Sequence, residues 1–280
     1  MKHPLGLTAA ITVLCLPVGM AWAQNVAIVT DLSGKVAAQP PLTILAEIAA
    51  GAGVKLDAGS RLVVVYVKSG DEYSFTGPAQ IQFRSGGPEV AGGAKPQRKA
   101  NPLGKGSGVT IRPISVAQGA FVMRSGRPTS RIKLLTLSGT KTLELAPEFR
   151  WQETEPGAQY RFELTDETGK SLHEGQIGGV AFKLPAAVQL REGVAYTWEL
   201  SARLGDGRRY VSAGDFTVAD GGLRSQALNL RPAAGAPVSQ RVAYAAWLEQ
   251  AELRDEARRY WKALAAERPS DEKLKALAAD

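Results

Sequence analysis

Between residues 25 and 83, short apolar runs alternate with turns that contain glycine. Residues 62–67 are continuously apolar and largely β-branched, which predicts a buried strand. Residues 69–72 (SGDE) then supply the glycine and aspartate that tight turns favour. Beyond them, Tyr73 and Phe75 alternate with polar residues, as expected of a half-buried return strand. The pattern therefore predicts a β-hairpin.

The hairpin contains two adjacent carboxylates, Asp71 and Glu72, which could be read as a catalytic acid pair. Neighbouring side chains on a strand point to opposite faces of the sheet, so this pair is poorly placed to share one substrate. Gly77-Pro78 ends the return strand, and Ile81 and Phe83 resume the alternation in the next one. We expect the two acids to be structural.

Residues 134–220 show alternation typical of a second β domain, with turn signals at roughly ten-residue intervals. Tyr160, Phe162 and Leu164 are predicted to point inward from one strand. Trp151 and Trp198 each lie within an alternating strand, which indicates core packing more than a ligand platform. This segment resembles the immunoglobulin and fibronectin-III modules of bacterial surface proteins, and the resemblance implies a β-sandwich.

Residues 238–280 change to a helical period, after a segment at 221–237 that is a linker by composition. Pro269 is expected to end the second helix, and Ser270 to cap a short third helix. The apolar positions resemble one tetratricopeptide repeat, and they fall on these residues: Ala245, Leu248, Ala257 and Trp261. One such repeat must bury its apolar face against its own sandwich or against a partner. Because Trp247 lies off the stripe made by Ala245 and Leu248, it is the candidate residue for docking a partner.

The chain begins with a basic residue, Lys2, followed by an apolar stretch over residues 7–20 and by the sequence Ala-Trp-Ala at 21–23. This order is typical of a secretory signal peptide, and the stretch is short for a membrane helix. We expect cleavage after Ala23 and a periplasmic or secreted protein. The single cysteine, Cys15, lies in the leader, so the mature chain would contain no disulfide.

The formal net charge of +7 is concentrated in one part of the chain, because residues 84–133 hold ten basic residues and one acid. Within this part, residues 84–112 are rich in Gly, Pro and basic residues and are expected to form a loop. Four side chains are candidates for binding an anionic envelope polymer: Arg98, Lys99, Lys105 and Arg112. The alternative is a solvated basic loop with no ligand. The loop has no aromatic residue for stacking on bases, so nucleic acid is not an expected partner.

The turn glycines and strand residues of the first segment resemble the FecR-type domain. The matching motifs are Gly34-Lys35-Val36, residues 53–62, Ser69-Gly70-Asp71 and residues 75–79 (FTGPA). The resemblance implies a periplasmic β domain over residues 24–133. In that family the domain takes part in surface signalling through a membrane helix and a cytoplasmic segment, and neither is expected in the mature chain.

The sequence therefore predicts a mainly β protein: a FecR-like β domain (24–133), an immunoglobulin-like sandwich (134–220) and a C-terminal helical hairpin (238–280). It offers no cysteine after the leader and one histidine, His173, so nucleophilic triads and metal sites are not expected. We expect a non-enzymatic binding or assembly module of the bacterial cell envelope, without a cofactor. The alternative is an envelope glycan-processing enzyme that uses paired carboxylates.

Overall fold

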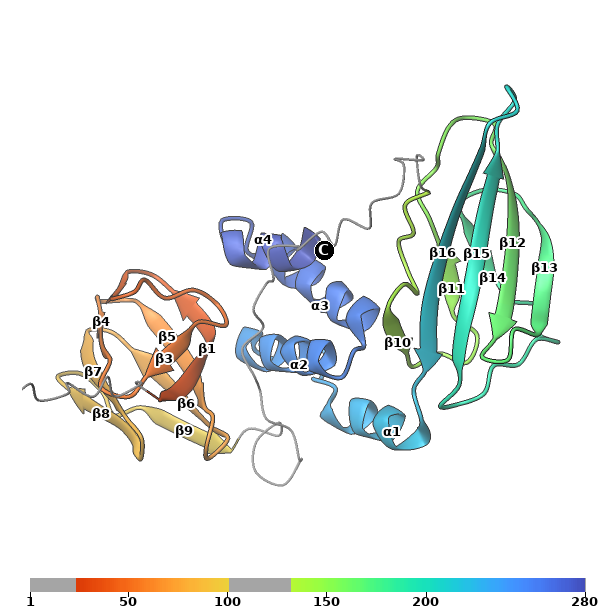
Figure 1. Cartoon of the computed structure of the whole chain (residues 1–280). Helices are drawn as coiled ribbons and strands as arrows, with labels where there is room; N and C mark the ends of the chain where they lie inside the picture. Colours follow the sequence, from red (N-terminus) through yellow and green to blue (C-terminus); the bar gives the residue numbers. More distant parts are fainter. Residues whose placement is uncertain (1–23, 101–131, 280) are drawn as a thin grey trace, which may run out of the picture.

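The computed structural model describes residues 24–100 and 132–279. These residues form a mainly β protein with two β domains and four C-terminal helices (Figure 1). The expected leader (1–23), Lys105 and Arg112 lie outside the described residues.

The first β domain consists of two facing sheets. One sheet has the order β3-β1-β5-β6-β9 and the other β2-β4-β7-β8. The strands are β1 (Asn25–Ser33), β2 (Val36–Ala38), β3 (Glu47–Ala49), β4 (Gly53–Leu56), β5 (Arg61–Tyr66), β6 (Asp71–Thr76), β7 (Ala79–Arg84), β8 (Gly87–Ala91) and β9 (Gln97–Ala100). A core that includes Leu62, Phe75, Ile81 and Phe83 fills the space between the sheets.

The predicted hairpin is confirmed, since β5 and β6 pair antiparallel with Leu62 opposite Phe75. Strand β6 ends at Thr76 and strand β7 begins at Ala79, so Gly77-Pro78 separates two strands as predicted. A β-carbon at Gly77 would lie 1.9 Å from the carbonyl oxygen of Asp57. Only glycine fits this approach of two backbones.

The structure differs from the expected loop at residues 84–112. Its described part contains β8, which pairs with β7, and β9, which pairs with β6. Both are edge strands, and all four residues of β9 are exposed. An exposed edge strand buries little apolar surface, so its composition reads as a loop although its backbone is paired.

The second β domain packs a five-stranded sheet, β10-β16-β15-β12-β13, against the two-stranded sheet β11-β14. Its strands are β10 (Thr140–Thr142), β11 (Glu148–Arg150), β12 (Gln159–Asp166), β13 (Ser171–Ile177), β14 (Ala181–Lys183), β15 (Ala195–Arg203) and β16 (Arg209–Val218). Phe149 of β11 packs edge-on against Phe162 and Trp198 of the larger sheet, at centroid distances of 4.8 and 5.2 Å. Trp151 and Trp198 are both buried, as predicted.

Four helices follow: α1 (Gly221–Leu230), α2 (Val238–Gln250), α3 (Arg254–Glu267) and α4 (Glu272–Ala279). The expected linker at 221–237 therefore begins with a helix, whose first turn is capped by the Asp220 carboxylate through Leu223 N (2.8 Å). The α3 helix ends before Pro269 as predicted, but the cap of α4 is the Asp271 carboxylate and not Ser270.

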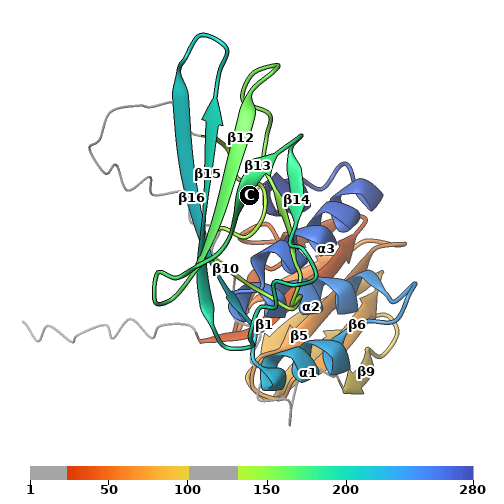
Figure 2. The same cartoon turned by 90° about the vertical axis from the view of Figure 1, so that its right-hand side faces the viewer.

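The helices lie between the two β domains (Figures 1 and 2). Their core also contains Ile28 and Val65, from the face of β1 and β5 that is turned away from the first sandwich core, together with Ile44 and Leu45. This explains why residues 62–66 are apolar without alternation: the sheet is covered on both faces, by its partner sheet and by helices. The helical face thus packs against the first β domain, whereas the sequence suggested its own sandwich or a partner.

Polar contacts join the same helices to the second β domain. The Thr140 hydroxyl of β10 accepts from Arg254 N and donates to the Glu252 carbonyl, each at 3.0 Å. The Asp255 carboxylate accepts from Leu137 N at 2.7 Å. The first turn of α3 is thereby bonded to the strand entering the sandwich, and the helical unit α2–α4 contacts both β domains.

Candidate binding surfaces

The basic candidates Arg98 and Lys99 lie on β9, beside the acids of the predicted hairpin. The Arg98 guanidinium forms an ion pair with Asp71, with Nη2 and Oδ2 2.9 Å apart. Lys99 stands opposite Glu72 in the strand register. The structure brings these two basic residues together with two acids, so part of their charge is neutralised within the sheet. How Lys105 and Arg112 lie relative to them falls outside the described residues.

Asp71 and Glu72 do point to different faces of the sheet. Asp71 meets Arg98, whereas the buried Glu72 carboxyl faces Ser239 at the start of α2. Burial raises the pKa of Glu72, against the lowering effects of Ser239 and of Lys99. As the sequence predicted, the two carboxylates lie in different surroundings and do not share one site.

Trp247 is not exposed, which corrects the prediction that it docks a partner. It is 5% exposed and stacks on Tyr244 with ring centroids 5.6 Å apart. The Tyr244 hydroxyl in turn donates to the Ala227 carbonyl of α1, at 2.9 Å. The sequence analysis expected no helix before residue 238, and the additional helix α1 packs in the same core as Trp247. Trp247 therefore belongs to the core.

Two further acids, Asp166 and Glu155, are also held by hydrogen bonds or ion pairs. The Asp166 carboxylate accepts from Thr168 N and Lys170 N, at 2.9 and 3.1 Å. The hydrogen bond from the Thr168 hydroxyl, followed by these two backbone bonds, lowers the pKa of Asp166. Glu155 forms an ion pair with Arg208 at 2.9 Å. Arg208 pairs with Asp206 as well, so Glu155 and Asp206 are bridged by one guanidinium.

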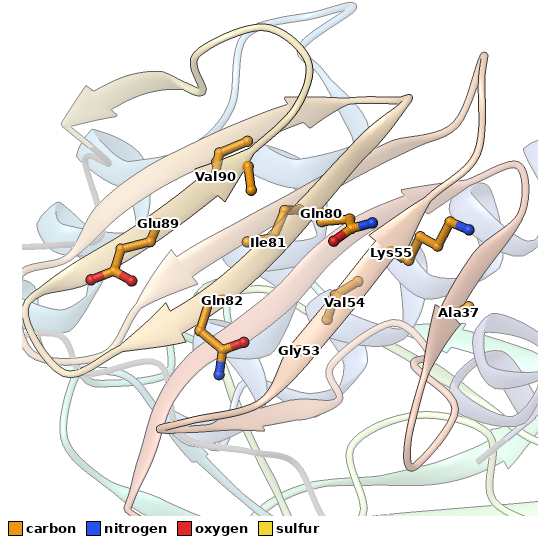
Figure 3. Close-up of a pocket in the computed structure, with 10 residues that line it drawn as sticks. Ala37, Gly53, Val54, Lys55, Gln80, Ile81, Gln82, Glu89 and Val90 are labelled. Atoms are coloured by element: carbon orange, nitrogen blue, oxygen red, sulfur yellow. The ribbon is translucent and has the colours of Figure 1, made fainter.

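A first hollow lies on the outer face of the sheet β2-β4-β7-β8, with a volume of about 680 Å³ (Figure 3). Small residues let it form, because Ala37, Gly53 and Ala91 stand where neighbouring strands carry long side chains. In register, Lys55 lies opposite Gln80, and Gln82 lies between Gly53 and Glu89.

The first hollow offers uncharged hydrogen-bonding groups more than charge. Gln80 and Gln82 each carry an amide that can donate and accept, and Gln82 is held by a bond from Nε2 to the Gly51 carbonyl (2.5 Å). Glu89 is paired with Arg84 at 3.2 Å, so Lys55 is the cation among the described residues of the lining. Such a surface suits a polar ligand with several hydroxyl or amide groups.

A second hollow, of about 410 Å³, lies on the outer face of the second β domain. It is lined by residues of β12, β13, β15 and β16, near the end of the β15–β16 hairpin. Three arginines line it, namely Arg161, Arg203 and Arg209. The described residues of this lining include no acid, although Arg161 is paired with the neighbouring Glu174. This hollow is positively charged.

Both hollows escaped the sequence reasoning, which weighed the charge of a loop and the aromatic residues of a helix. The alternation of inward and outward positions along the strands did carry a signal for both hollows. Gln80 and Gln82 occupy outward positions at the first hollow, and Arg203 and Arg209 occupy outward positions at the second. Their meeting depends on which strands are neighbours and in what register, and the sequence pattern does not specify either.

Among the residues that the structure describes, no group of three or more potential metal ligands lies close enough to hold an ion. His173 lies on β13 and stacks on Phe182, with centroids 5.1 Å apart. The described helices also include none with the length and apolar character needed to cross a membrane.

Comparison with known proteins gives a partial likeness only. No family model matches the chain, and no curated protein does. Among the solved structures, CopC from Methylosinus trichosporium OB3b matches at 19% identity with a TM-score of 0.26, over 32% of this chain and 96% of CopC. This likeness concerns the β fold of one part of the chain. The resemblance to the FecR-type domain stays a prediction.

Proposed function

We propose that this protein is a non-enzymatic binding or assembly module of the bacterial cell envelope. The expected signal peptide supports a periplasmic or secreted location. A role in surface signalling is a more specific form of the proposal and rests on the FecR-like motifs of the first β domain.

The observation that carries the proposal is the helical unit that contacts both β domains. Ile28 and Val65 of the first domain are part of its core, and Thr140 and Leu137 of the second are bonded to the start of α3. Each domain carries a polar hollow on an outer sheet face. A protein built in this way can hold two polar ligands, or two parts of one polymer, in a constant relation.

Sedimentation of the secreted protein with purified envelope material tests this proposal. The protein is mixed with cell-wall sacculi, with outer-membrane vesicles or with neither, and the bound fraction is measured. We expect salt-sensitive co-sedimentation with at least one material. Absence of binding to both would overturn the proposal, and release of soluble sugar from the sacculi would overturn its non-enzymatic part.

Two matched variants assign the binding to a region. Replacing Arg98, Lys99, Lys105 and Arg112 together by Ala tests the basic segment predicted from the sequence. Contacts between exposed charges are screened over about 8 Å at physiological ionic strength, so binding through this segment should weaken steeply with salt. Replacing Lys55, Gln80 and Gln82 together by Ala tests the first hollow, and binding there should depend less on salt.

A further inference from the structure

The second hollow contains a pair of like charges that the fold alone does not require. Arg203 of β15 stands directly opposite Arg209 of β16 in the antiparallel register. Like charges in such a position repel each other and weaken the pairing of the strands. An explanation is therefore needed for why both are arginine.

Two nearby acids do not relieve this repulsion, because both are paired with an arginine outside the lining of the hollow, Arg208. Arg208 pairs with Asp206 in the hairpin turn and with Glu155 across the domain, at 2.5 and 2.9 Å. Over the described ranges 24–100 and 132–279, the side chains of Arg203 and Arg209 take part in no hydrogen bond or ion pair. Two guanidinium groups with unused donors thus face the same hollow.

The floor of the hollow has an unused hydroxyl. Ser201 lies two residues before Arg203 on the same face of β15, and it is only 8% exposed. Its hydroxyl has no hydrogen-bond partner in the part of the chain that the structure describes. Because Ser201 lines the hollow, this hydroxyl can donate a hydrogen bond to a bound acceptor.

The donors approach from separate strands. Arg161 of β12 stands opposite Ser201, and Arg203 and Arg209 lie on the two strands beyond it. Neighbouring strands are about 4.8 Å apart, so one small ligand in the hollow can be reached by guanidinium groups from three strands. A planar carboxylate is satisfied by a single forked arginine, whereas a tetrahedral phosphate can accept from several directions.

We propose that this hollow binds a phosphate group, held by Arg203 and Arg209 with Arg161 and the Ser201 hydroxyl. The proposal deepens the envelope-binding function and rests on it only for the source of the phosphate, which would be a lipid head group or a phosphate-containing polymer. Recognition requires no metal and no chemical step.

Titration with inorganic phosphate tests the site, followed through the Nε–Hε NMR signals of the arginines at constant ionic strength. We expect saturable shifts of the Arg203 and Arg209 signals. Arg203→Gln and Arg209→Gln should each weaken binding roughly tenfold, because each removes a charge-assisted contact. The matched control Arg191→Gln removes an exposed arginine before the opposite end of β15 and should leave the affinity unchanged.

A second variant tests the proposal by a gain of affinity. Glu174 pairs with Arg161 at the rim, so Glu174→Gln should free that guanidinium and strengthen phosphate binding severalfold. This result does not depend on the stability of the arginine variants. Shifts that chloride reproduces at equal ionic strength, or an equal loss in the Arg191 control, would overturn the proposal.

The source of the phosphate is distinguished by two further probes. Vesicles of phosphatidylglycerol are compared with vesicles of phosphatidylcholine, and polyphosphate is tested without lipid. If one of these probes binds the wild type and fails to bind Arg203→Gln, that probe identifies the source of the phosphate and the loss supports the site. If inorganic phosphate does not bind while the protein still sediments with envelope material, this inference fails and the proposed function stands.

Discussion

Arg268, which follows the last turn of α3, lies with its guanidinium Nη1 2.7 Å from the carboxylate Oδ1 of Asp31 on β1. Nη1 also donates to the Leu32 carbonyl at 3.2 Å. Because the Asp31 side chain is 7% exposed, Arg268 neutralises a buried charge of the first β domain from within the helical unit.

Replacing Arg268 by Ala should therefore destabilise the protein by about 1–3 kcal/mol, since it leaves a buried carboxylate without its cation. Urea unfolding measures the change in the free energy of unfolding. The control Arg84→Ala breaks an ion pair in which both side chains are more than half exposed, and it should cost at most about 1 kcal/mol. Equal losses in the two variants would show that Arg268 does not join the domains.

Trp247→Ala and Trp261→Ala should both destabilise the protein, by about 3–5 kcal/mol each, since both indoles are buried and truncation leaves a large cavity. The measurement is the unfolding midpoint in urea. Leu228→Ala, at a position that is 62% exposed, is the control and should change stability by less than about 0.5 kcal/mol. Wild-type stability in Trp247→Ala would restore the surface role predicted from the sequence.

Glu256 should make stability depend on pH. Burial raises the pKa of this carboxyl on α3 from 4.5 to about 7, opposed in part by Arg259 and reinforced by Asp255. One of its oxygens, Oε2, is buried without a hydrogen-bond partner in the described structure. The folded protein holds the proton more tightly than the unfolded chain, so the stabilisation is complete below pH 4.5 and is lost as the pH rises through 7.

Glu256→Gln should accordingly be more stable than the wild type at pH 8, by on the order of 1–3 kcal/mol, and close to it at pH 4. Urea unfolding at the two pH values checks this. Glu167→Gln, at an exposed turn, removes the same charge and should show no such difference between the two pH values. A pH-independent effect of Glu256→Gln would indicate packing rather than ionisation.

Gly77→Ala should destabilise the first β domain by about 2 kcal/mol or more, because the added methyl meets the Asp57 carbonyl oxygen at 1.9 Å and one backbone must move. The control is Gly86→Ala, where the methyl meets nothing within 4 Å. Thermal unfolding of both variants is the measurement. If the two midpoints agree, the close approach of the strands at Gly77 is not a constraint.

Local patterns of residues were enough to predict the local structure wherever one pattern dominated. Alternation at Tyr160, Phe162 and Leu164 predicted an inward face, and all three are buried. The change to a helical period predicted α2 and α3, and Pro269 predicted the end of α3. These features depend on the period of the backbone and on proline sterics, which act within a few residues.

What covers each face of a sheet or helix could not be predicted in this way, because it depends on the packing of distant elements. The apolar run of β5 lies between a sheet and helices. Trp247 lies in a core shared with α1, a helix that the sequence pattern indicated as a linker. Arg98 pairs with Asp71 through the edge strand β9. The meeting of Arg203 and Arg209 likewise depends on strand register. Such relations join residues that are distant in sequence, and register and layer order arise from the packing of whole elements rather than from any local pattern.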